Sequence, residues 1–185
     1  MLINVVDTEF NRTGTLIQIG AVQLDVKSGV IGKRFGVLIN CRETLDPEIV
    51  TLTGITQTDV DGGIELKDGL SQFWGWCGSK NLGAWGSDAR ELVRQSRWLA
   101  VGVPEDLRYF DVSEMGQVLR CAFPQAKRGG LRSTLELFGL VWSGPQHEAT
   151  SDAFNTARLL HRFVDITKSY YEVQKLVAHP TKLEV

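Results

Sequence analysis

Cysteine is scarce in this 185-residue sequence, whose three cysteines are widely spaced and form no Cys-x-x-Cys pair. Reduced thiols in a cytosolic protein are the simplest interpretation of that usage. Long apolar runs are missing as well, because none approaches the ~18 residues that cross a bilayer. The N-terminus shows neither a basic n-region nor an apolar h-region. We therefore expect a soluble, cytoplasmic protein with no membrane partner.

A large excess of charge of either sign is also lacking. The formal net charge at pH 7 is −2, so the whole molecule offers no field that would attract a polyanion. A nucleic-acid partner would have to be held by local Lys and Arg groups, by bound metal, or by both. No Walker-type phosphate-binding loop is present, which excludes a nucleoside-triphosphate site of that kind.

The composition is that of a globular protein, with 43% hydrophobic and 23% charged residues. By the usual domain size of about 100–200 residues, 1–185 should form a single domain. Three strand-like stretches joined by short turns predict an antiparallel meander. Helices and strands then alternate, which predicts an α/β fold: a mixed sheet with additional parallel strands, covered by helices on both faces. The strands are expected at Leu2–Phe10, Leu16–Leu24, Lys33–Ile39, Asn81–Gly86 and Tyr109–Val112, and the helices at about 47–54, 64–77, 87–99, 113–123, 131–139 and from 151 onward.

Several of these helices begin at residues that commonly cap helix N-termini. Asp46 is the expected N-cap of the first helix, with Pro47 at its first position. Ser87 and Ser113 are the expected N-caps of two later helices. Gly139 is expected to end a short one.

The first candidate functional residues end the first strand. Asp7 and Glu9 are separated by one residue, so the pleat of a strand would aim both carboxylates to the same side, about 7 Å apart along the backbone. Such a pair can hold a cation. Taken alone, such a pair is far more often the solvated end of a strand, so the interpretation as a cation site needs further carboxylates from elsewhere in the chain.

Three further residues strengthen the interpretation as a cation site. Asp88 directly follows a predicted strand and lies in the first turn of a helix, and such strand ends form ligand crevices in parallel sheets. Its alternative role is to stabilise the helix dipole. Asp152 lies at the start of the last helix. His147 precedes Asp152 in the sequence and is expected on a loop. This loop can cover a site that has Asp152 at its base.

Taken together, these residues resemble a known set. Asp7-Thr8-Glu9, the stretch from Ala84 to Asp88 and the stretch from His147 to Ala153 are similar to the three motifs of the DEDDh (DnaQ-like) 3′–5′ exonucleases of the ribonuclease H-like superfamily. The order, the separations and the His-x-x-x-x-Asp spacing agree. The resemblance covers about residues 2–165 and leaves a helix extension and tail at 166–185. Gln18–Ala21 and Leu52–Thr56 add secondary similarity, and the RNase T-like or KapD-like branches are the nearest candidates.

The resemblance implies a 3′–5′ exonuclease that removes nucleotides from the 3′ end of single-stranded RNA or DNA. Two divalent ions would support phosphodiester hydrolysis, and hard oxygen ligands suit Mg²⁺ or Mn²⁺. By resemblance, Asp7 would bridge both ions, with Glu9 and Asp152 chiefly on the side of the attacking water and Asp88 often acting through water. His147 would be the general base, because an imidazole is largely neutral near pH 7 and still basic.

Substrate contacts are expected from Thr8 and from the segment that contains Leu52, Thr53 and Ile55. By resemblance, this segment stacks beside the terminal base and holds the 3′ end, since apolar stacking suits single strands of any sequence. Its alternative role is core packing under a short helix. Arg128 and Arg132, which flank Gly129-Gly130, could contact phosphates or form a solvated charge cluster.

Other functions remain open at this point. One is a catalytically silent nuclease-fold module that only binds nucleic acid or protein. Another is a hydrolase of small nucleotides or very short oligonucleotides, for which the weak net charge would be easier to understand. A third is a structural α/β protein with fortuitous motifs. The sequence also leaves homodimerisation and the choice between ribose and deoxyribose open.

Overall fold

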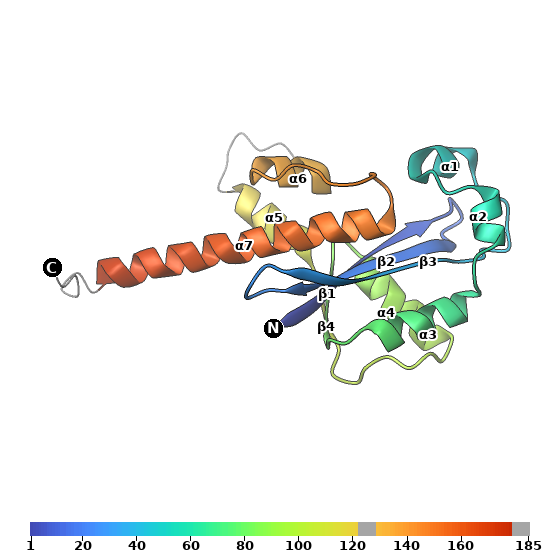
Figure 1. Cartoon of the computed structure of the whole chain (residues 1–185), viewed down its shortest axis with the longest axis horizontal. Coiled ribbons are helices and arrows are strands. Elements are labelled where there is room, and N and C mark those ends of the chain that lie inside the picture. Colours follow the sequence, from blue (N-terminus) through green and yellow to red (C-terminus); the bar gives the residue numbers. More distant parts are fainter. Residues whose placement is uncertain (122–128, 179–185) are drawn as a thin grey trace.

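A mixed β-sheet runs through the centre of the protein (Figure 1). The computed structural model describes residues 1–121 and 129–178. Its strands are β1 (Leu2–Phe10), β2 (Leu16–Asp25), β3 (Ile31–Leu38), β4 (Asn81–Ala84) and β5 (Arg108–Asp111). They lie in the order β3-β2-β1-β4-β5, with β1, β2 and β3 antiparallel, β4 parallel to β1, and β5 parallel to β4. The meander and the parallel strands predicted from the sequence are confirmed.

Helices cover both faces of the sheet, as the sequence predicts. They are α1 (Pro47–Thr53), α2 (Gln57–Asp61), α3 (Leu66–Trp76), α4 (Asp88–Trp98), α5 (Val112–Cys121), α6 (Leu131–Leu137) and α7 (Ala149–Ala178). The first part of α7 packs on β1 and β2 together with α5 and α6, whereas α3 and α4 lie on the opposite face (Figure 1). The second part of α7 projects beyond the sheet (Figure 1).

The alternation of side chains along β1 decides which face receives the candidate carboxylates. Ile3 and Val5 are buried in the cluster that contains α7 residues, whereas Val6 is buried in the cluster formed with α3 and α4. Because side chains alternate along a strand, Asp7 and Glu9 face α7. A slip of one residue would send the carboxylates into the apolar core beneath α3 and α4, so the burial of both faces fixes the register.

The helix starts confirm Asp46 and Ser87 as N-cap residues and correct the prediction for Ser113. The Asp46 side chain accepts a hydrogen bond from the Glu48 backbone N–H at 2.8 Å. Ser87 precedes α4 but makes no side-chain capping bond. Ser113 is not the N-cap of α5, because Asp111 accepts from its N–H at 2.7 Å and the helix already begins at Val112.

Two other helices differ from the expectation. The sequence did not predict α2, a single short helix whose start is stabilised by a reciprocal capping box of Thr56 and Asp59. The last helix, α7, begins at Ala149, two residues before the expected Ser151. The expected end of α5 near residue 123 and the tail after Ala178 lie outside the described residues.

Across residues 1–121 and 129–178, no helix combines the length and the apolar character needed to span a bilayer. The cytoplasmic location expected from the sequence stays a prediction. Homodimerisation also stays untested.

Candidate active site

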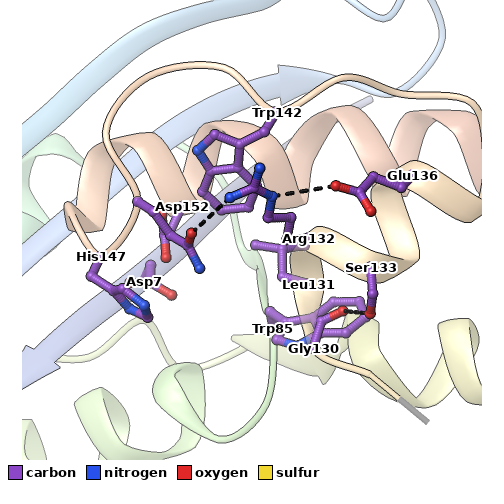
Figure 2. A pocket seen from close by; sticks show the side chains of 11 residues that line it. Asp7, Trp85, Gly130, Leu131, Arg132, Ser133, Glu136, Trp142, His147 and Asp152 are labelled. Atoms are coloured by element: carbon purple, nitrogen blue, oxygen red, sulfur yellow. Dashed lines mark hydrogen bonds and ion pairs between the residues drawn. The ribbon is translucent and has the colours of Figure 1, made fainter. Parts of the chain in front are cut away.

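The end of β1 and the start of α7 bring four of the five expected site residues together. Ligand atoms of Glu9, His147 and Asp152 all lie within 4.8 Å of one another. Asp7 lines the same pocket as His147 and Asp152 (Figure 2). These residues are far apart in the sequence, so the fold assembles the group.

A glycine on the neighbouring strand allows α7 to start this close to the sheet. Gly20 on β2 pairs with Asp7, and a Cβ atom at Gly20 would lie only 2.2 Å from the carbonyl carbon of Ala149. No larger residue fits without displacing the backbone. Nearby, the side chain of Gln18 accepts a hydrogen bond from the Ala149 N–H at 3.0 Å. The close approach of α7 to β2 therefore places Asp152 over Asp7.

Asp88 joins the group from the parallel half of the sheet. It is the first residue of α4, which follows β4 after the short connection of residues 85–87, and Val6 pairs with Ala84 where β1 and β4 run side by side. The hydroxyl of Thr8, which is buried, donates a hydrogen bond to the Asp88 carboxylate. The strand-end argument from the sequence thus leads to an acidic residue whose charge acts on Asp7.

The carboxylates disfavour one another's ionised forms. Burial raises the pKa of Asp7 well above its usual value, and the charge of Asp88 is the next largest cause. Burial, followed by the charges of Asp152 and Asp88, raises the pKa of Glu9 to about 8. Burial also raises the pKa of Asp152 to about 7. Without a compensating positive charge, these groups would retain protons near neutral pH.

The donor atoms fit a hard divalent cation. Asp152 is 9% exposed, and its Oδ1 is buried with no hydrogen-bond partner in the described part of the chain. An unpartnered buried carboxylate oxygen is costly unless a cation or a donor satisfies it. Carboxylate oxygens are the ligands that Mg²⁺ and Mn²⁺ prefer. The residues present therefore suit a metal centre.

His147 is held in place by a tightly turned loop. Its backbone adopts the left-handed conformation, with φ of 59°, which is uncommon for a residue other than glycine. Its N–H bonds to the Asp152 carboxylate and offsets part of the rise in the pKa of that residue. The indole N–H of Trp142 donates to the Gly144 carbonyl at 3.0 Å in the same loop.

Sequence reasoning did not assign a role to Glu148. Its carboxylate accepts hydrogen bonds from the backbone N–H groups of Thr150 at 3.1 Å and Ser151 at 2.8 Å, so it caps the start of α7. Its charge also raises the pKa values of Asp152 and Glu9. An acidic residue just before a helix is a recognisable capping signal, but its proximity to the other carboxylates depends on the fold.

A pocket of about 490 Å³ extends from the acidic group towards α6 (Figure 2). Asp7, His147 and Asp152 line one part of it, and Arg132 and Trp142 line another. Trp85 and Gln146 also contribute to its wall. Arg132 is therefore placed beside the candidate site, whereas Arg128 lies outside the described residues.

The three expected contacts for the terminal base lie on or just after α1. Leu52 is 50% exposed, whereas Ile55 is 7% exposed and packs in the small core with Ile17 and Val60. The hydroxyl of Thr53 accepts a hydrogen bond from the Ile55 N–H at 3.1 Å. None of the three is among the residues that line the 490 Å³ pocket. Of the three, Leu52 presents the most open apolar surface.

The sequence matches a known family and several curated proteins. The family model RNase_T, described as an exonuclease, matches residues 5–160. ERI1 exoribonuclease 2 of Xenopus laevis is 28% identical over an alignment of 206 positions, which covers 95% of this chain and 30% of that protein. ERI1 exoribonuclease 2 of Homo sapiens is 27% identical over 85% of this chain and 26% of its own length. The chain thus spans less than a third of the length of these relatives.

Solved structures with the same fold include nucleases. The nuclease domain of 3′hExo, a DEDDh family member bound to rAMP, has a TM-score of 0.74 and 22% identity, covering 89% of this chain and 92% of that one. Exonuclease X in complex with 5′ overhanging duplex DNA has a TM-score of 0.67 and 18% identity, covering 90% of this chain and 93% of that one. These similarities confirm the ribonuclease H-like fold expected from the sequence.

Proposed function

This chain belongs to the RNase_T exonuclease family, and from that membership and the site geometry we propose that it removes nucleotides from the 3′ end of single-stranded nucleic acid by hydrolysis. The observation that carries the proposal is the assembly of Glu9, His147 and Asp152, with their ligand atoms within 4.8 Å, beside the buried Asp7. A module that only bound nucleic acid would not need buried carboxylates that repel one another.

Two divalent ions, Mg²⁺ or Mn²⁺, would be held by Asp7, Glu9, Asp88 and Asp152. When bound, they would offset the charge of the carboxylates and of the substrate phosphate. The chain contributes buried oxygen ligands in fixed positions. The hydrogen bond from Thr8 orients Asp88, and the contact between α7 and Gly20 orients Asp152.

His147 acts as the general base in this proposal. Its imidazole accepts a proton from the attacking water as the new P–O bond forms. The bond between phosphorus and the 3′ oxygen of the preceding nucleotide breaks, and that oxygen takes a proton from solvent. The products are a nucleoside 5′-monophosphate and a chain with a free 3′ hydroxyl. The hydrogen bond between the His147 backbone and Asp152 keeps the base next to the acidic group.

The terminal base is assigned to Leu52 on α1. The half-exposed Leu52 side chain offers an apolar surface on which a base can stack. Ile55 is buried in the small core with Ile17 and Val60, and its N–H donates a hydrogen bond to the Thr53 hydroxyl in the turn that follows α1. Thr8 acts on the substrate indirectly, through its hydrogen bond to Asp88.

The test is digestion of end-labelled single- and double-stranded RNA and DNA with Mg²⁺ or Mn²⁺. We expect 5′-labelled single strands to shorten stepwise from the 3′ end in the presence of a divalent ion. Asp7→Ala should abolish cleavage while the protein stays folded by circular dichroism. Asp106→Ala, which changes an exposed carboxylate paired with Lys80, should behave like the wild type.

The same gels separate this proposal from its alternatives. An active Asp7→Ala protein, or a wild type that cleaves none of the substrates, would contradict it. Rapid turnover of a dinucleotide with none of a twenty-mer would instead indicate a hydrolase of very short oligonucleotides. Similar proteins include exoribonucleases and an exonuclease bound to DNA, so both sugars belong in the test.

A further inference from the structure

The pocket beside the acidic group has a second part that the proposed reaction does not use. Figure 2 shows Arg132 and Trp142 set apart from Asp7 and His147 along the same pocket. Its volume of about 490 Å³ lies in the range of sites that hold small organic ligands. Because the hydrolysed phosphate must lie at the carboxylates, this second part is open to a neighbouring piece of the substrate.

Arg132 gives this part of the pocket its positive charge. Among the described residues that line the pocket, it is the one with a cationic side chain. The guanidinium donates to Gln146 Oε1 at 3.3 Å and to Glu136 Oε1 at 3.3 Å. Both contacts are long, and the side chains of Arg132 and Glu136 are 57% and 60% exposed. A phosphate, which accepts two parallel hydrogen bonds from a guanidinium, can replace such weak partners.

The backbone that carries Arg132 is held by packing. Its neighbours on α6, Leu131 and Leu135, are buried in the core beneath α7. The adjacent turn is closed by a hydrogen bond from the Ser133 hydroxyl to the Gly130 carbonyl at 3.0 Å. A charged side chain on a rigid element is a better anion ligand than one on a loop.

An aromatic ring lies beside this arginine. Trp142 lines the same part of the pocket, and its indole N–H is held by the Gly144 carbonyl. Nucleobases of every kind stack on aromatic side chains, which gives affinity without sequence preference. Gln146, which contacts Arg132, lies next to His147 in the sequence, so the same loop connects this aromatic and cationic surface to the proposed base.

The position of α1 and α6 indicates which nucleotide would bind here. In Figure 1 the two helices lie on opposite sides of the start of α7, where the acidic group is found. If the terminal base lies against Leu52 on α1, the rest of the nucleic-acid strand leaves the acidic group on the side of α6. We propose, on the basis of the proposed function, that Arg132 and Trp142 form a subsite for the nucleotide that precedes the scissile phosphate. Arg132 pairs with the 5′ phosphate of that nucleotide, and Trp142 stacks on its base.

The test compares three small substrates. The p-nitrophenyl ester of a nucleoside 5′-monophosphate has the scissile phosphate and the terminal nucleoside only. A dinucleotide adds the preceding nucleoside, and a 5′-phosphorylated dinucleotide adds its phosphate. We expect Arg132→Ala to lower kcat/KM for the 5′-phosphorylated dinucleotide about tenfold or more, as for a lost charge-assisted hydrogen bond. The ester should be hydrolysed at the wild-type rate, and the preference for the 5′ phosphate should disappear.

Two further variants complete the design. Trp142→Leu should lower kcat/KM for both dinucleotides and leave the ester unaffected. Arg97→Ala, which removes an exposed arginine on α4 at the opposite face, is the matched control and should change none of the three rates.

The outcomes separate the two proposals. If the wild type hydrolyses none of the substrates with Mn²⁺, the proposed exonuclease function fails. If the wild type is active but Arg132→Ala keeps the preference for the 5′ phosphate, or slows the ester as much as the dinucleotides, the subsite assignment is wrong. Where the ester is a poor substrate, the ratio between the two dinucleotides decides the question alone.

Discussion

Two acidic clusters in this protein contain the same functional group in opposite surroundings. The first, called the turn cluster, consists of Glu43 and Asp46. Glu43 Oε1 accepts hydrogen bonds from Asn11 Nδ2 at 2.7 Å and from the Thr13 hydroxyl. These donors hold the pKa of Glu43 below its usual range. The Asp46 side chain accepts from a helix N–H.

The second, called the site cluster, consists of Asp7, Glu9, Asp88 and Asp152. Burial and mutual repulsion raise the pKa of Glu9 to about 8 and of Asp152 to about 7. Hydrogen-bond donors complete the turn cluster, whereas the site cluster leaves a buried oxygen of Asp152 without a partner in the described chain. From this difference we infer that the site cluster receives positive charge, whereas the turn cluster fixes the backbone.

The largest expected contrast between the clusters is in the rate of hydrolysis. Asp152→Asn should lower kcat/KM on a labelled single strand by about a thousandfold, because ion-ligand contacts supply several kcal/mol to such reactions. Glu43→Gln should leave the rate within about twofold. It should lower the free energy of unfolding by about 1 kcal/mol, since charge-assisted hydrogen bonds are weakened.

Urea denaturation of both variants supplies the control. Asp152→Asn should be at least as stable as the wild type without divalent ions, because it replaces a carboxyl group whose ionised form is disfavoured by burial. Equal losses of activity in the two variants would contradict the proposal that only the site cluster takes part in hydrolysis.

The sequence predicted the parts of the site that depend on local pattern. The alternation along Leu2–Phe10 correctly placed Asp7 and Glu9 on one face, and the Asp46-Pro47 pair marked a helix start. The fold class followed from three strands and the alternating elements after them. Each of these inferences rests on residues that are close in the chain.

What the sequence could not supply arises from contacts between distant segments. The role of Gly20 depends on the approach of Ala149, which no local pattern encodes. Glu148 appeared as part of a motif, but its effect on Glu9 depends on burial. The capping prediction for Ser113 failed because the side chain of Asp111, two residues earlier, reaches its N–H. Sequence spacing alone also could not distinguish Glu43 from a metal ligand. The groups that donate hydrogen bonds to its carboxylate, Asn11 and Thr13, lie in a different turn of the chain.

A second, smaller contrast should appear in the response of stability to divalent ions. A ligand at a hundred times its Kd stabilises by about 2.7 kcal/mol, which for a domain of this size raises Tm by about 5–10 °C. We expect Mn²⁺ to produce such a shift in the wild type and in Glu43→Gln. Asp152→Asn should lose most of it. Calorimetric scans with and without EDTA measure the shift, and an equal shift in all three proteins would place the ions elsewhere.

The smallest contrast lies in how stability depends on pH without divalent ions. The pKa of Glu9 is raised from 4.5 to about 8 on folding, so between these values the folded state binds more protons than the unfolded one. The free energy of unfolding must then fall as pH rises from about 4.5 to about 8. The contribution of Glu43 to the pH dependence of stability has the opposite sign. Because the pKa of Glu43 is lowered on folding, this contribution is present above pH 4.5 and lost in acid.

Urea titrations in EDTA between pH 5 and pH 8 should therefore show decreasing stability in the wild type. Glu9→Gln should make the decrease smaller, with the remainder due to Asp7 and Asp152. Glu43→Gln should retain the full decrease, because Glu43 is already ionised throughout this interval. Saturating Mn²⁺ should flatten the decrease, since the cation then replaces the protons on the site cluster. A wild type whose stability stays constant over this interval in EDTA would show that the carboxylates of the site cluster are ionised without a cation, and the contrast with the turn cluster would vanish.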